Sequence, residues 1–317
     1  MSVIVRLEKV EKRYRDVHAL RSVDLEIGEG DAFGFIGPNG AGKTTTLKIL
    51  ATLLRPSAGR AQVCGIDVAH RPEEVKPLIG YMPDVLGVYD DMLVQEYLEF
   101  FAAAYRIHGE RRRKVIDDVL ALTDLGGKRE AQVRSLSRGM GQRLGLARVL
   151  LHDPKVLLLD EPAAGLDPRA RIEFKQLVLE LRRMGKTLLI SSHILGEIGE
   201  MCNTIGIIEQ GKMLFAGSIE EVQKKVRPGT RVQVRLREDP AAGRTHAEAM
   251  EILRGHPAVE ALRPGEAGFE VLLRPGCDDA SVVSADLATR GFRILHFAEE
   301  AVDLEEVFLH VTKGVVS

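Results

Sequence analysis

The sequence has no tryptophan, only three cysteines and no long apolar run. Cys64, Cys202 and Cys277 are far apart, odd in number and form no CxxC pair, so we expect reduced thiols rather than a disulfide framework or a zinc site. No apolar run approaches the roughly 18 residues of a membrane span, and the N-terminal residues lack the apolar core of a signal peptide. A cytosolic location is therefore the expectation.

A strong excess of one charge is also missing. Lys and Arg number 44 against 46 Asp and Glu, which gives a formal charge of -2. This balance provides no overall attraction to nucleic acid or to an anionic membrane, and no nucleic-acid partner is expected. With 317 residues the chain is long enough for two domains, since domains commonly have about 100–200 residues.

The most informative stretch is a glycine-rich loop that follows the short apolar segment 32–36 and opens into 46–54, which has helical spacing. It has the pattern GxxxxGK[ST] and consists of Gly37, Pro38, Asn39, Gly40, Ala41, Gly42, Lys43, Thr44 and Thr45. Glycines let successive N–H groups face one anion, and the helix adds its positive N-terminal end. We expect Lys43 to reach the β- and γ-phosphates of a bound triphosphate and Thr44 to offer its hydroxyl to Mg²⁺. The alternative is a glycine-rich turn without a ligand.

A second apolar segment, 156–159, ends in the carboxylates of Asp160 and Glu161. Buried strands seldom end in paired acids without cations or donors nearby, because an isolated buried charge is costly. Beside a phosphate loop, Asp160 can hold Mg²⁺ and Glu161 can face the water that attacks the γ-phosphate. His193, at the end of the apolar segment 188–192, is a candidate γ-phosphate contact, although a structural hydrogen bond is the commoner role for such a histidine.

Two further residues allow alternative interpretations. Ser137 is a good N-cap for the helix expected around 144–150, and a capped, glycine-flanked helix start is also an anion site. Tyr14 precedes a turn at 15–16 between two predicted antiparallel strands, 3–8 and 20–27. Its ring can stack on adenine or pack on neighbouring strand residues.

The remaining segments indicate how the chain is divided. Strands are predicted at 60–64 and 78–82, and amphipathic helices at 94–102 and 114–122 indicate a helical insert at about 85–150. After a short helix at 219–226 and a linker at 227–229, the order strand, helix, strand, strand, helix, strand predicts a small ferredoxin-like α+β domain. These elements are expected at 231–236, 246–254, 258–262, 268–273, 280–289 and 292–297, with a final helix at 304–309. We thus expect domains at 1–226 and 230–317.

Over roughly residues 3–225 the order of these motifs resembles the nucleotide-binding subunit of ATP-binding cassette (ABC) transporters. The matching parts are Tyr14, the loop 37–45, GYMPD (80–84), LSRGM (136–140), VLLLDEP (156–162), AGLD (164–167) and SSH (191–193). The resemblance implies an α/β P-loop NTPase cassette, with a mixed core sheet, an antiparallel β subdomain and the helical insert.

The same resemblance implies roles for particular residues. Lys43, Thr44 and Thr45 would bind phosphates and Mg²⁺, Asp160 would support the metal, Glu161 would position or activate water, and His193 would contact the γ-phosphate. Asp167 would link two active sites, while Ser137 and Gly139 would bind the γ-phosphate held by a second copy. ATP would then lie between two chains, most simply a homodimer.

Two motifs depart from the usual family pattern. In the LSGGQ signature, Arg138 and Met140 replace Gly and Gln, while Ser137 and Gly139 are kept. Asp84 stands where the family usually has Gln. A carboxylate could ligate Mg²⁺ directly but would repel the γ-phosphate, so altered metal dependence or slow turnover is expected.

The function implied is an ATPase that powers export of a drug-like, lipid or other small substrate through a separate membrane permease. The ending DLEEVFLHVTKG (303–314) resembles the tail of bacterial exporter ATPases of the drug and antibiotic resistance type. The chain would lie at the cytoplasmic face of the membrane and contact the permease near 84–94. Alternatives are a cassette ATPase acting on ribosomes or DNA, which the single cassette and balanced charge disfavour, and a nucleotide-binding module without efficient hydrolysis. The C-terminal domain is expected to serve dimerisation, regulation or packing.

Overall fold

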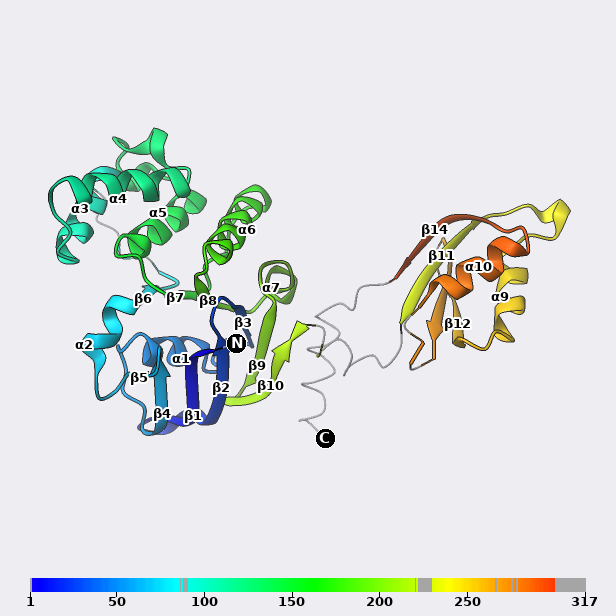
Figure 1. Ribbon diagram of the computed structural model, residues 1–317, viewed down its shortest axis with the longest axis horizontal. Helices are drawn as coiled ribbons and strands as arrows, with labels where there is room; N and C mark the ends of the chain where they lie inside the picture. Colours follow the sequence, from blue (N-terminus) through cyan, green and yellow to red (C-terminus); the bar gives the residue numbers. More distant parts are fainter. Residues whose placement is uncertain are drawn as a thin grey trace. The chain divides into compact units, whose positions relative to one another are not determined.

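The computed structural model describes residues 2–85, 87, 91–219, 221, 230–265, 267–274, 276–277 and 279–299. The chain divides into two compact units, with the change at 219–220 (Figure 1). The predicted linker at 227–229 and the predicted helix at 304–309 lie outside the described residues, as do most of the predicted helix 219–226 and part of the predicted permease contact at 84–94.

The central sheet of the first unit has six strands in the order β10-β9-β3-β8-β7-β6. All neighbours are parallel except β10, which pairs antiparallel with β9, so the sheet is mixed as predicted. Every residue of β3, β7 and β8 is buried, which explains the apolar runs 32–36, 156–159 and 188–190 within them. The strands are β3 (Ala32–Ile36), β6 (Ile79–Met82), β7 (Val156–Asp160), β8 (Thr187–Ser192), β9 (Thr204–Glu209) and β10 (Lys212–Ser218).

A second sheet is antiparallel, in the order β2-β1-β4-β5. Its strands are β1 (Val3–Tyr14), β2 (Val17–Gly28), β4 (Ala58–Val63) and β5 (Ile66–Asp67). One apolar core joins this sheet, α1 (Lys43–Leu50) and the central sheet, and it includes Leu7, Leu25, Leu47 and Leu158. Since full burial of a leucine contributes about 1.5–3 kcal/mol, this core fixes α1 against both sheets.

Helices α3 (Val94–Ala104), α4 (Gly109–Leu122) and α5 (Arg138–Leu150) group together on one side of the first unit (Figure 1). They contact one another, and α5 also packs on β6 and on α6 (Pro168–Arg183). The helices predicted at 94–102 and 114–122 are confirmed. The other helices of this unit are α2 (Pro72–Val75), α7 (Leu195–Met201) and the 3-10 turns at Lys76–Leu78, Gly126–Lys128 and Val133–Ser135.

The second unit pairs four antiparallel strands in the order β12-β13-β11-β14. Val232, Val234 and Leu236 face a core that they share with residues of the two helices. The chain order is the βαββαβ order that the sequence predicts: β11 (Arg231–Arg237), a 3-10 turn (Pro240–Ala242), α9 (His246–Arg254), β12 (Val259–Gly265), β13 (Gly268–Leu273), α10 (Ser281–Thr289) and β14 (Arg293–Glu299). Among all described helices, none is both long and apolar enough to cross a bilayer.

His152 ties the helical group to the central sheet. Its Nε2 lies 2.8 Å from the carbonyl oxygen of Ile79 in β6, and its ring stacks on Tyr105 with the centroids 4.1 Å apart. A carbonyl oxygen only accepts, so Nε2 carries the proton and the neutral ring needs none on Nδ1. Burial lowers the pKa of His152 below its usual value of 6.5.

We expect acid to destabilise the protein through His152. Because the pKa is lower in the folded state, the unfolded chain binds the proton more readily. The stabilising contribution of the neutral ring is therefore complete above the unfolded pKa of 6.5 and is lost as the pH falls through the folded pKa. His152→Gln keeps an amide donor for Ile79 but does not titrate. Its thermal midpoint should fall less than that of the wild type between about pH 7.5 and about pH 5.

The matched control is His108→Gln, which changes an exposed histidine of the same unit. Its midpoint should follow the wild-type pH dependence. Parallel curves for the wild type and His152→Gln would contradict this role of His152.

Candidate functional site

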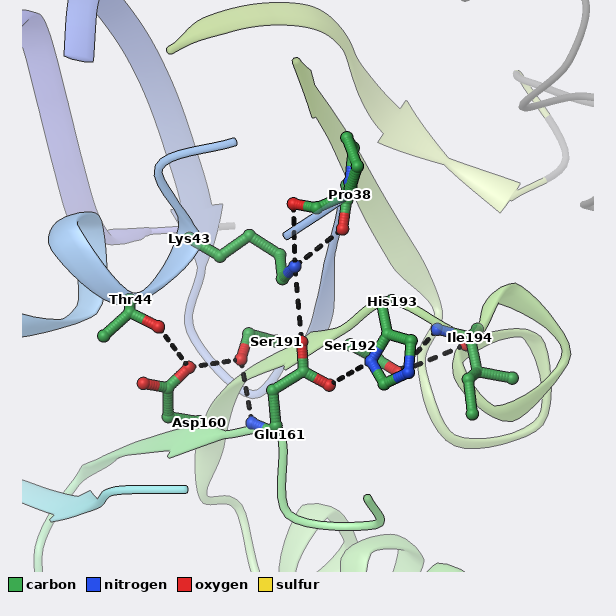
Figure 2. Close-up of polar contacts among 10 residues, drawn as sticks. Pro38, Lys43, Thr44, Asp160, Glu161, Ser191, Ser192, His193 and Ile194 are labelled. Atoms are coloured by element: carbon green, nitrogen blue, oxygen red, sulfur yellow. Dashed lines mark hydrogen bonds and ion pairs between the residues drawn. The ribbon is translucent and has the colours of Figure 1, made fainter. Parts of the chain in front are cut away.

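Three chain segments meet at the carboxyl ends of β3, β7 and β8, because these strands are neighbours in the parallel part of the sheet. They are the loop 37–42, the acidic pair at the end of β7 and the end of β8 with His193 (Figure 2). A cavity of about 210 Å³ opens here, lined by Ala19, Asn39, Gly40, Ala41, Gly42, Lys43, Thr44, Thr45, Asp84 and Glu161. The cavity thus contains most of the predicted phosphate-binding residues.

The glycines of the loop are required by close contacts and by backbone conformation. Gly42 has a φ of 114°, and a Cβ there would lie 2.6 Å from Leu20 Cδ2 and 2.9 Å from the carbonyl oxygen of Ala19. A Cβ on Gly37 would lie 2.2 Å from the carbonyl oxygen of Ile208. Gly42 precedes α1 and provides no side-chain cap. The first N–H groups of α1 are therefore without a side-chain acceptor and can face an anion.

Lys43 is almost completely buried, with 5% of its surface exposed. Its Nζ donates to the carbonyl oxygens of Gly37 at 2.6 Å and Pro38 at 3.3 Å, and forms an ion pair with Glu161 Oε1 at 3.3 Å. A buried ammonium is costly unless it is paired, and these partners supply that pairing. The cation consequently lies between the loop and the acid that follows β7 (Figure 2).

A chain of hydrogen bonds connects the acidic pair to the start of α1 and to the end of β8. Asp160 Oδ1 accepts from Thr44 Oγ1 at 3.1 Å and from Ser191 Oγ at 2.7 Å. Ser191 Oγ also accepts the backbone N–H of Glu161 at 2.9 Å, and His193 Nδ1 lies 2.8 Å from Glu161 Oε2. Because a carboxylate only accepts, His193 Nδ1 carries the proton. Glu161 is thereby held between a cation and an imidazole.

The electrostatics at Asp160 favour a bound cation. Burial raises the pKa of Asp160, the hydrogen bonds from Ser191 and Thr44 lower it, and the charges of Glu161 and Asp84 raise it again. Burial and the charge of Asp160 likewise raise the pKa of neighbouring Tyr81. The negative charge concentrated here is costly in the protein alone, and a divalent cation would relieve that cost.

The donor set fits Mg²⁺. The carboxylate of Asp160 and the hydroxyl of Thr44 supply hard oxygen ligands side by side. In the part of the chain that the structure describes, no group of three or more His, Cys, Asp or Glu residues is arranged to hold a metal ion. Mg²⁺ usually takes only one or two protein carboxylates and completes its shell with water and phosphate oxygens. Such a site needs the nucleotide to be complete.

Glu161 has a backbone φ of 48°, in the left-handed region that favours glycine. Non-glycine residues in this region cost about 1–3 kcal/mol and are concentrated at functional sites. The N–H bond to Ser191, Lys43 and His193 together hold the residue in this conformation.

Eight predicted site residues do not line this cavity. Four of them, Gly37, Pro38, Asp160 and His193, are joined to lining residues by the contacts described above. The other four make no such contact in the part of the chain that the structure describes. Tyr14, at the end of β1, is 40% exposed, and Lys12 Nζ lies 5.1 Å from its ring centroid. Ser137 caps α5 by accepting from Met140 N at 3.3 Å, and Asp167 caps α6 by accepting from Ala170 N at 2.8 Å. Gly139 lies in the first turn of α5 against Ala170. Their proposed roles with adenine or with a second copy stay predictions.

Ser191 is the important residue to which sequence reasoning assigned no role. It lies opposite Asp160 in the β7–β8 ladder, so its hydroxyl reaches both acids. The only signal in the sequence is a pair of serines at the end of an apolar run. That pattern does not reveal which strand will lie alongside.

Comparisons with known proteins agree with this geometry. A family model described as "ABC transporter" matches residues 20–164. The chain is 34% identical to the daunorubicin resistance ATP-binding protein DrrA2 of Streptomyces coeruleorubidus, over 97% of this chain and 94% of that protein. It is also 34% identical to the Nod factor export ATP-binding protein I of Burkholderia orbicola, over 97% of this chain and 96% of that protein. An ABC transporter ATP-binding protein of Synechocystis is 36% identical to this chain. That match covers 69% of this chain and 64% of the Synechocystis protein.

The first unit also resembles solved structures. A dimeric post-hydrolysis state of the ATP-binding cassette MJ0796, bound to ADP and Pi, superimposes with a TM-score of 0.62 at 26% identity. The match covers 68% of this chain and 99% of that one. The predicted α/β cassette fold is therefore confirmed.

Ser191→Ala should lower the free energy of unfolding by about 1–3 kcal/mol, because it leaves the buried Glu161 N–H without its acceptor and removes a donor from Asp160. Chemical denaturation of the variant and the wild type measures this. Ser135→Ala is the control, since that hydroxyl is exposed and donates to the carbonyl oxygen of Gln132. Equal stability of Ser191→Ala and the wild type would show that the shared hydroxyl contributes nothing.

Proposed function

The chain belongs to the ABC transporter family of ATP-binding proteins, and we propose that two copies bind and hydrolyse ATP together to drive a separate membrane permease. As a member of the family it binds ATP and is an ATPase. The observation that carries the proposal is the contact of Glu161 with both Lys43 and His193 beside the phosphate loop.

In the proposed reaction the loop N–H groups and the start of α1 bind the phosphates. Lys43 turns from the carbonyl oxygens of Gly37 and Pro38 toward the β- and γ-phosphates, which releases Glu161 from its ion pair. Glu161, still oriented by His193 and by its N–H bond to Ser191, then positions the attacking water and accepts its proton. Mg²⁺, held by Thr44 and Asp160 with Asp84 nearby, neutralises phosphate charge when bound.

The second copy has a specific task in this proposal. Ser137 and Gly139 begin α5 and do not line the cavity of their own chain, so their N–H groups and hydroxyl are available to a γ-phosphate held elsewhere. A related cassette is known as a dimer with ADP and Pi. We propose a homodimer in which each chain completes the site of the other, with Asp167 between the two sites and Tyr14 stacked on adenine.

Export is proposed from the relatives. The full-length relatives are named for daunorubicin resistance and for Nod factor export, which supports export of a small organic substrate through a separate permease at the cytoplasmic face of the membrane. The proposed permease contact lies near 84–94, where Val85 is 79% exposed. An exposed apolar residue at this position is available to a partner protein.

The first test measures ATP hydrolysis by the purified chain at increasing protein concentration. If two copies form each site, the rate per chain rises with concentration. Glu161→Gln should bind ATP but lose about 100-fold or more of the rate, because an amide cannot accept the proton. Glu180→Gln, a surface change in α6 at a carboxylate that pairs with Arg183, should retain activity. A Glu161→Gln variant with the wild-type rate would refute the proposed chemistry.

A second test concerns Asp84. Replacing it with Gln removes a negative charge that lines the cavity, so less charge repels the γ-phosphate and one hard metal ligand is lost. We expect faster hydrolysis and a shifted Mg²⁺ optimum, measured by titrating Mg²⁺ at fixed ATP. Asp91→Asn is the control, because that carboxylate is exposed and pairs with Arg134. An unchanged rate together with an unchanged optimum would contradict the role of Asp84.

A further inference from the structure

Arg138 is the first residue of α5, where the family signature usually has glycine. Its guanidinium lies directly against Gly165. A Cβ on Gly165 would be 2.6 Å from Cζ, 2.6 Å from Nη1 and 2.9 Å from Nη2 of Arg138. Such similar distances to three atoms of a planar group place the flat face of the guanidinium over the position that a Cβ of Gly165 would occupy.

Gly165 lies in the segment 161–167, which joins Glu161 to Asp167. Two turn bonds shape this segment, from Ala164 N to Glu161 O at 3.1 Å and from Leu166 N to Ala163 O at 3.2 Å. Glu161 and Gly165 both have positive φ, at 48° and 67°. A segment with an unfavourable conformation at Glu161 depends on external contacts to keep it.

The backbone of α5 next to Arg138 is held in place by packing. A Cβ on Gly139 would lie only 2.7 Å from Ala170 Cβ, so the first turn of α5 packs tightly on the first turn of α6. The backbone at Arg138 is thus held next to the segment 161–167. In the described part of the chain, no ion pair or hydrogen bond is recorded for its guanidinium, so its contact with Gly165 is one of packing.

We propose that Arg138 is a positioning residue, whose guanidinium covers Gly165 and keeps Glu161 in its place for hydrolysis. The inference rests on the proposed function, because it requires Glu161 to act on the attacking water. It deepens that function by linking two parts of one chain. The start of α5 is proposed to bind the phosphate held by the second copy. Through Arg138, this helix start also contacts the segment that carries Glu161. A shift of α5 would then be transmitted to Glu161.

The shape of the side chain, rather than its charge, is what the proposal requires. Arginine presents a rigid plane that can lie flat on a glycine backbone, whereas lysine presents a compact ammonium on a flexible stem. Arg138→Lys therefore separates this role from a direct electrostatic contact with phosphate, which lysine would preserve.

The first experiment compares kcat and KM for ATP in Arg138→Ala, Arg138→Lys and the wild type. Both variants should lose about tenfold in kcat, since a misplaced catalytic group slows the reaction, while KM changes little. Their unfolding midpoints should match the wild type because Arg138 is exposed. Arg183→Ala, at the far end of α6, is the control and should retain the wild-type kcat. A normal kcat in Arg138→Lys, or a raised KM with normal kcat, would overturn the proposal.

A double-mutant cycle tests the contact itself. Gly165→Ala strains the backbone at a φ of 67° in either background, and when Arg138 is present its Cβ also displaces the guanidinium. The loss of kcat should therefore be larger with Arg138 than with alanine at that position. Additive effects would show that the two residues do not act through each other. Glu161→Gln, measured in parallel, distinguishes the two hypotheses. If it remains active the proposed function fails, and if it is inactive while Arg138 variants are normal only the present inference fails.

Discussion

The site depends on the cost of burying the ammonium group of Lys43. A charge with only 5% of its residue exposed must be compensated locally, and the compensation comes from two loop carbonyl oxygens and from Glu161. These partners determine the curvature of the loop and the direction of the acid. A phosphate group offers the same compensation with more negative charge. When Lys43 exchanges these protein partners for phosphate oxygens, Glu161 is released from its ion pair. This exchange is a physical basis for coupling nucleotide binding to the release of Glu161.

The parallel strands give this charge balance its geometry. The order β3-β8-β7 places the phosphate loop, the serine end of β8 and the acidic end of β7 at one edge of the sheet. Within that edge the register sets Asp160 opposite Ser191, and one hydroxyl then serves both acids. A shift of the register by one residue would turn Ser191 to the other face of the sheet and break both hydrogen bonds.

Much of the fold could be predicted because its signals are local. The amphipathic spacing at 94–102 and 114–122, the apolar runs 32–36 and 156–159, and the N-cap Ser137 all predicted elements where the structure has them. The resemblance to ABC cassettes identified the acids, His193 and the phosphate loop together. Sequence reasoning gave no role to Ser191 and no partner to Arg138, because both act through residues about 30 positions away along the chain.

The sequence by itself determined the phosphate loop, since its glycines, Lys43 and Thr44 are consecutive and their chemistry needs only the strand before them and the helix after them. It also determined which two acids end a buried strand. Only the tertiary structure decided that Glu161 would lie between Lys43 and His193, that Ser191 would bridge the acids, and that Arg138 would cover Gly165. The physical reason is that these contacts follow from strand order, register and helix packing. These bring together segments that are far apart in the sequence, and a local sequence pattern cannot show which distant segment will lie alongside.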